Sequence, residues 1–159
     1  MGGELGIRRD FRGGWMLSAY YGYTRAEMLA DGRLTTFLQL DGEPGFRHVA
    51  NTPTHAATFK GIAPFLVRGL SLSTRMTFED RRWDRYEHDG EPSQFRTRAA
   101  ALWDLVMLAE DEKQNLSAAL GVYNVFDYEY RFPVSSEYVP LRTMPAAGRS
   151  LLLSVEIRR

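Results

Sequence analysis

The stretch that decides the fold reads Leu70-Ser71-Leu72-Ser73-Thr74-Arg75-Met76-Thr77-Phe78-Glu79. Its even positions are apolar apart from one threonine, and its odd positions are polar or charged. Successive side chains of a β-strand point to opposite faces of the sheet. This alternation therefore predicts a strand that has one apolar face and one polar face.

The same period of two recurs in six other segments. We expect strands over residues 3–11, 15–25, 55–63, 95–109, 116–123 and 151–158. The segment 95–109 also suits a helix, because a helix over 99–120 would contain many Ala, Leu, Glu, Lys and Gln residues, which favour that structure. We expect a strand there, since Arg98 and Asp104 both fit the alternation and the neighbouring segments all resemble strands.

Connections between these strands alternate in length. The short ones are 12–14, 64–68 and 110–114, and the long ones are 29–51, 86–94 and 128–147. Outer-membrane β-barrels have short periplasmic turns and longer extracellular loops. Loops longer than about 12–15 residues are uncommon in compact soluble domains. The predicted fold class is therefore all-β, an antiparallel transmembrane β-barrel segment of about seven strands.

The composition combines two classes of residue that soluble domains seldom need together. Aromatic residues make up 13% of the chain and charged residues 25%, with a mean hydropathy of −0.34. A barrel wall with one face in lipid and the other in a wet lumen uses both classes. A soluble β-sandwich binding module with the same aromatics in its core is the alternative. The net charge of zero argues against a nucleic-acid partner.

Residues for catalysis or metal binding are not grouped in this sequence. Cysteine is absent, which excludes thiolate nucleophiles and disulfides. The three histidines, His48, His55 and His88, are scattered, and no zinc-protease, nucleophile-elbow or phosphate-loop spacing occurs. We therefore expect no enzymatic activity, no cofactor and no metal.

The alternation also predicts which face each side chain occupies. An Arg or Lys that faces the middle of a bilayer destabilises a barrel by about 2–4 kcal/mol, whereas a lumen position tolerates charge. We expect these apolar positions to face lipid: Leu17, Tyr21, Leu72, Met76, Leu120, Leu153 and Val155. We expect these charged positions to face the lumen: Arg75, Glu79, Arg98 and Glu156.

Three motifs together resemble one known family. One strand ends in Asn124-Val125-Phe126-Asp127, followed by Tyr130, which is similar to the family's N-L-F-D-x-x-Y with valine in place of leucine. Gly148 and Arg149 precede the last strand, and the stretch that starts at Pro53 looks like the family's Pro-x-His at the beginning of a strand. In these residues the chain resembles the C-terminal part of TonB-dependent outer-membrane receptors.

The resemblance implies an architecture and a role. Such receptors are 22-stranded barrels that import ferric siderophores, cobalamin and similar scarce solutes across the bacterial outer membrane. Residues 1–159 would be the C-terminal portion of the barrel, with the plug domain absent from them. The implied partners are outer-membrane lipid, a plug domain and a TonB-type energising protein.

Two points stand beside this resemblance. The chain ends in Arg159, whereas outer-membrane barrels usually end in an aromatic residue. A small self-contained outer-membrane barrel with a structural or adhesive role is a further alternative, which would require an even number of strands.

A dense cluster of charged and aromatic residues follows the segment 70–78. Arg82, Arg85, Tyr86 and His88 are the candidate ligand-contacting residues, because guanidinium and aromatic groups together can hold an anionic ferric chelate. The plainer interpretation is a solvated rim whose acidic residues neutralise its arginines, or a surface that contacts lipopolysaccharide phosphates. The pattern does not identify the solute.

Overall fold

The computed structural model describes residues 1–30, 45–48, 51–65, 67, 69–88, 91–111, 113–134 and 143–157. All regular structure in these ranges is β-strand. They contain no helix with the length and apolar character needed to cross a membrane. The terminal Arg159 lies outside the described ranges, and so does the expectation attached to it.

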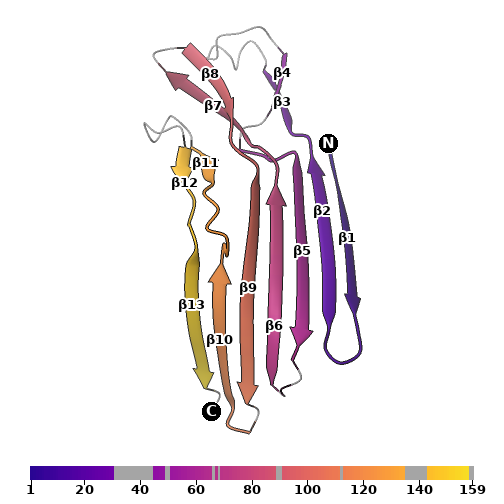
Figure 1. Cartoon of the computed structure of the whole chain (residues 1–159). Helices are drawn as coiled ribbons and strands as arrows, with labels where there is room; N and C mark the ends of the chain where they lie inside the picture. Colours follow the sequence, from indigo (N-terminus) through magenta and orange to yellow (C-terminus); the bar gives the residue numbers. More distant parts are fainter. Residues whose placement is uncertain are drawn as a thin grey trace.

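Seven strands form one antiparallel sheet (Figure 1). They are β1 (Gly2–Asp10), β2 (Met16–Thr24), β5 (His55–Pro64), β6 (Leu70–Glu79), β9 (Ala100–Asp111), β10 (Leu116–Tyr123) and β13 (Ser150–Ile157). The order in the sheet is the order in the chain, so each strand pairs with the next one and β1 and β13 form the two edges. The predicted seven-stranded antiparallel sheet is confirmed.

The ambiguous segment is a strand and not a helix. β9 pairs with β6 on one side and with β10 on the other. It begins at Ala100, however, and not at residue 95 as predicted, because the residues up to Arg96 pair with residues 83–88 in a separate hairpin. Arg98 lies between Arg96, where that hairpin ends, and Ala100, where β9 begins. The alternation that was used to place Arg98 on the lumen face therefore does not apply to it.

Each long connection contains a short hairpin of its own. The pairs are β3 (Glu27–Ala30) with β4 (Gly45–His48), β7 (Trp83–His88) with β8 (Glu91–Arg96), and β11 (Arg131–Pro133) with β12 (Thr143–Pro145). All three hairpins lie at one end of the sheet, and the short turns lie at the other (Figure 1). The predicted segregation of long and short connections is confirmed. The sequence did not indicate the hairpins, in which these segments satisfy backbone hydrogen bonds by pairing with themselves.

The short turns depend on residues with positive φ. Gly13, Gly14 and Gly69 have φ of 83°, 86° and 81°, a region that residues with a Cβ atom seldom adopt. A Cβ atom at Gly69 would lie 2.1 Å from the carbonyl oxygen of Glu110. Glycine at this position therefore allows the β5–β6 turn to approach the end of β9.

The sheet has almost no apolar core. Ala100 is the single buried residue among the described aliphatic and aromatic residues other than glycine and proline, whereas Leu5 and Leu153 are 74% and 69% exposed. A β-sandwich would cover such residues with a second sheet, but the other sheets in the described ranges are two-stranded hairpins. The apolar surface of this fold is thus on the outside.

Candidate functional site

One face of the sheet is apolar across all seven strands. The register places Phe59 directly opposite Met76, and directly opposite residues of antiparallel strands share a face. By the same rule, every position predicted to face lipid is on this face: Leu17, Tyr21, Leu72, Met76, Leu120, Leu153 and Val155. Arg9 and Asp111 also share it, but they lie at the end with the short turns. The middle of this face therefore carries no charge.

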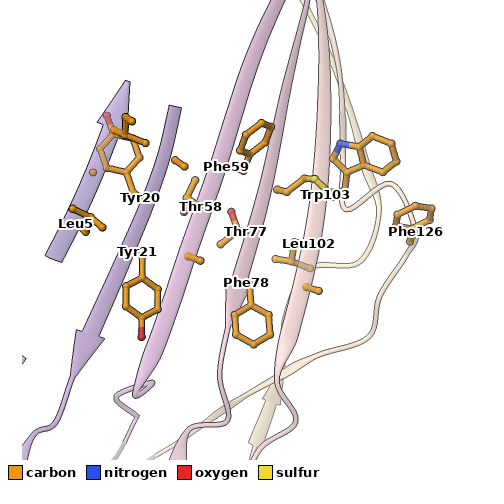
Figure 2. Close-up of a pocket in the computed structure, with 16 residues that line it drawn as sticks. Leu5, Tyr20, Tyr21, Thr58, Phe59, Thr77, Phe78, Leu102, Trp103 and Phe126 are labelled. Atoms are coloured by element: carbon orange, nitrogen blue, oxygen red, sulfur yellow. The ribbon is translucent and has the colours of Figure 1, made fainter. Parts of the chain in front are cut away.

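Aromatic side chains line a hollow on the apolar face (Figure 2). The hollow measures about 720 Å³ and includes Tyr21 of β2, Phe59 of β5 and Trp103 of β9. Phe126 reaches it from the connection after β10, with its ring centre 5.4 Å from that of Trp103. Ala57, directly opposite Tyr21, leaves space between the rings. This arrangement is typical of the aromatic girdle of a membrane barrel.

The opposite face carries the charges. The register places Arg75 opposite Lys60 on one side and opposite Asp104 on the other. The Arg75 guanidinium donates to Asp104 Oδ2 through Nη2 at 2.6 Å and through Nε at 2.9 Å. Arg8 and Asp10 form a second ion pair on this face, with 3.0 Å between Nη2 and Oδ1. Within the described part of the chain Lys60 has no ion-pair partner. The predicted sharing of this face by Arg75, Glu79 and Glu156 is confirmed.

No metal site accompanies these charges in the described ranges. They hold no group of three His, Asp or Glu residues that could bind a metal ion.

The motif after β10 forms a compact corner. Asn124 is 5% exposed, has a φ of 51°, and donates its backbone N–H to Asp104 Oδ1 at 2.9 Å. Its side chain binds Tyr128 twice, accepting from the backbone N–H at 2.9 Å and donating to the carbonyl oxygen at 3.0 Å. The Tyr128 hydroxyl donates to the carbonyl oxygen of Ala99 at 2.8 Å. Asn124 therefore ends β10 and ties the next segment to the start of β9.

Asp127 joins this corner to the last strand. Its Oδ1 accepts the backbone N–H of Arg149 at 2.7 Å. A Cβ atom at Gly148 would lie 3.0 Å from the same oxygen, so glycine permits the close approach. The structure thus brings together four residues of the family motif, Asn124, Asp127, Gly148 and Arg149. Phe126 diverges from them onto the apolar face, where it is 69% exposed.

Arg82 makes several contacts at the end of the sheet that carries the three hairpins, which we call the outer rim. Its guanidinium pairs with the Glu79 carboxylate, donates to Asn51 Oδ1 at 2.9 Å, and lies 5.0 Å from the ring centre of Phe132. These contacts join the end of β6 to two connections, and they leave the side chain 17% exposed. The side chains of the other three candidate ligand-contacting residues lie outside the described part of the chain: Arg85, Tyr86 and His88. Ligand contact by the four residues stays a prediction.

Tyr130, the remaining motif residue, lies beside the Arg82 contacts. Its ring meets Phe132 edge-on, with centres 5.2 Å apart. Burial raises the pKa of the Tyr130 phenol, and the negative charge of Glu79 raises it further. The phenol therefore stays protonated at neutral pH and keeps its hydrogen-bond donor.

Sequence reasoning missed three residues of this rim. Thr97 is buried and accepts the backbone N–H of Arg82 at 3.0 Å, while Tyr128 and Asn51 make the contacts described above. Asn51 has a φ of 60°, and asparagine at the end of a connection is a sequence signal for such a conformation. Thr97 and Tyr128 carried no signal, because their partners lie 15 and 29 positions away in the chain.

Comparison with known proteins gives matches to solved structures alone. No protein-family model and no curated protein matches the chain. Matching structures include FpvA of P. aeruginosa with a heterologous pyoverdine and the FpvAI–pyocin S2 complex, each at a TM-score of 0.71 and 17% identity. They also include the ferripyoverdine receptor of the outer membrane of Pseudomonas aeruginosa bound to ferripyoverdine, at 0.68 and 18%.

These matches cover 96% of this chain and 18% of each receptor chain. At such low identity they show the fold. The chain has the fold of a segment of the barrel of a TonB-dependent receptor. The predicted fold class and the resemblance are therefore confirmed at the level of the fold.

Proposed function

We propose that residues 1–159 are the C-terminal portion of the β-barrel of a TonB-dependent outer-membrane receptor and take part in the uptake of a scarce solute, such as a ferric siderophore or cobalamin. The observation that carries this proposal is the division of one open sheet into an apolar face and a charged face, with all long connections at one end. The similarity to a receptor of the outer membrane supports it.

Outer-membrane lipid is the proposed partner of the apolar face. Leu5, Leu153 and Ile157 are 74%, 69% and 70% exposed, and a continuous apolar surface of this kind marks an interaction site. Among the described strands, β1 and β13 each pair on one side, which leaves unpaired backbone groups at both edges of the sheet, and such groups are costly in hydrocarbon. Further strands of a 22-stranded barrel would pair with both edges.

The charged face is the proposed lining of the lumen. Arg75 and Lys60 place two cations side by side on it, where a plug domain can offer acidic partners. A TonB-type protein would act on the plug, so the role of the wall is to bind and to guide, without catalysis or a cofactor. At the rim, the candidates for solute contact are Arg82, which also joins neighbouring segments, and Arg85, Tyr86 and His88 on β7.

A matched pair of substitutions tests the assignment of the two faces. Leu72 is on the apolar face opposite Met107, and the next residue, Ser73, is on the charged face opposite Val106. Leu72→Arg should destabilise the barrel by about 2–4 kcal/mol, whereas Ser73→Arg should leave it folded. Folding is measured as the shift in gel mobility on heating, in membranes that contain the full-length protein. Equal behaviour of the two variants would contradict the proposal.

The solute is tested by disrupting the gene that encodes the chain. Uptake of radiolabelled ferric siderophores and of labelled cobalamin is measured with and without the gene. Loss of uptake of one solute class identifies the cargo. Unchanged uptake of every class in a strain whose barrel is shown to be assembled would refute a role in transport.

A further inference from the structure

A buried carboxylate connects the charged face to the outer corner. Asp104 is 8% exposed, and its two oxygens have separate partners. Oδ2 accepts two hydrogen bonds from the Arg75 guanidinium on the charged face. Oδ1 accepts the backbone N–H of Asn124, the residue at which β10 ends and the outer connection begins. One side chain thus touches both parts of the structure.

The contacts continue beyond Asn124. Its side chain holds both backbone groups of Tyr128, and its carbonyl oxygen accepts the N–H of Asp127 at 2.8 Å. Asp127 in turn holds the N–H of Arg149, which precedes β13. The chain of hydrogen bonds therefore runs from Arg75 in β6 to the start of the last strand.

The two members of the ion pair differ in exposure. The Arg75 side chain is 50% exposed, whereas that of Asp104 is 11% exposed. An anion on the charged face can therefore reach Arg75 but not Asp104. If Arg75 turns toward such an anion, Asp104 is left as a buried charge with one remaining side-chain hydrogen bond, an arrangement that is strongly unfavourable.

We propose that the Arg75–Asp104 pair couples the charged face to the outer corner, so that a carboxylate that binds Arg75 on that face loosens the connection that begins at Asn124. Arg75 is the residue that meets the carboxylate, and Asp104 is the positioning residue that acts through Asn124. Competition for a single guanidinium takes Arg75 away from Asp104. The unpaired buried carboxylate is then stabilised by turning toward water, and this movement takes Oδ1 away from the Asn124 N–H. The location of this face in a lumen rests on the proposed function, but the coupling itself does not.

Lys60 supplies a built-in test, because it lies directly opposite Arg75 on the same face. Side chains at such positions are about 4.5–5.5 Å apart at Cβ. Lys60→Glu therefore places a competing carboxylate beside Arg75, and Lys60→Gln is the matched control that removes the same positive charge without adding a negative one. Arg75→Gln removes the guanidinium altogether, and Asp104→Asn removes the charge of the acceptor.

The readout is hydrogen–deuterium exchange in residues 124–130 of the full-length protein in detergent. We expect exchange there to be about tenfold faster in Lys60→Glu, Arg75→Gln and Asp104→Asn, equivalent to about 1.4 kcal/mol of local opening, and unchanged in Lys60→Gln. The heat-dependent gel shift is recorded for each protein. If the unsubstituted protein shows no heat-dependent gel shift, the result counts against the barrel. If the gel shift is present but the exchange rates differ from those expected, the result counts against the coupling.

Three outcomes would overturn the coupling. Equal exchange in Lys60→Glu and Lys60→Gln would show that the carboxylate does not compete for Arg75. Unchanged exchange in Arg75→Gln would show that the corner does not depend on the pair. If Arg75→Gln fails to fold, Arg75→Lys is used in its place, because lysine keeps the positive charge but cannot make the paired hydrogen bonds of the guanidinium to Asp104. Unchanged exchange in Arg75→Lys and Asp104→Asn together would refute the proposal.

Discussion

We expect Gly69→Ala to lower the stability of the folded protein more than other substitutions of this size in the short turns. Gly69 has a φ of 81°, and a Cβ atom would lie 2.1 Å from the carbonyl oxygen of Glu110 and 3.3 Å from its carbonyl carbon. The left-handed conformation costs an L-residue about 1–2 kcal/mol. The clash is with backbone, so it cannot be relieved by rotating a side chain.

Relief requires the β5–β6 turn to move away from β9. That movement breaks the hydrogen bond from the Glu110 N–H to the Gly69 carbonyl oxygen, which is 2.7 Å long. Such a bond contributes about 0.5–1.5 kcal/mol net. We therefore expect Gly69→Ala to lower the free energy of unfolding by about 1.5–3.5 kcal/mol.

The assay is urea unfolding of the full-length protein in lipid vesicles, followed by gel mobility. Gly22→Ala is the control, because Gly22 lies inside β2 and a Cβ atom there would meet no heavy atom within 4 Å. Its midpoint should stay close to that of the unsubstituted protein. Equal midpoints for Gly69→Ala and Gly22→Ala would show that neither the φ nor the close approach at Gly69 matters for stability.

Three further predictions follow from the corner, the rim and the apolar face. Asn124→Ala should lower the unfolding free energy by about 2–4 kcal/mol, because it loses two side-chain hydrogen bonds and forces alanine to a φ of 51°. Asn124→Gly should cost less in the same urea titration, and a larger cost would contradict the account. Because its folded-state pKa is raised, Tyr130 should contribute stability below about pH 10 that is lost as the pH rises further. Tyr130→Phe should flatten this alkaline loss, and an unchanged pH profile would rule out a contribution from the phenol. The isolated chain should aggregate without detergent, because its apolar face and both sheet edges are uncovered; a monodisperse, cooperatively unfolding monomer in sedimentation and thermal melts would favour a soluble fold instead.

The strands and the two faces could be predicted because both depend on neighbouring residues. Alternation in a segment such as Leu70–Glu79 indicates which side chains share a face, and the register leaves Leu72 and Arg75 on opposite faces as expected. The start of β9 was misjudged because alternation continues from residue 95 through residues 97–99, which belong to neither strand. Pairing with β7, a non-local contact, ends one strand at Arg96 and delays the next one to Ala100.

The site was less predictable than the fold. The family motif marked Asn124 and Asp127, but it did not show that Asp104 receives the Asn124 N–H from 20 positions away. Arg82 was selected as a ligand contact because arginine beside aromatics suits an anionic chelate. In the folded chain Arg82 also contacts Glu79, Asn51 and Phe132, which the sequence did not indicate, and its contact with a ligand stays a prediction. Composition identifies what a side chain can bind, and the tertiary neighbours decide what it does bind.

The open edges of the sheet have a consequence for genetic exchange. In the described ranges the other five strands of this sheet pair on both sides within the chain. In the proposed larger barrel the segment would therefore join its neighbours along two seams, β1 (Gly2–Asp10) and β13 (Ser150–Ile157). Backbone hydrogen bonds at a seam do not depend on side-chain identity, so the neighbouring strands need to match mainly in length and in the parity of their apolar positions. Recombination could therefore transplant this segment, with its surface hairpins, between distantly related barrels as a single cassette.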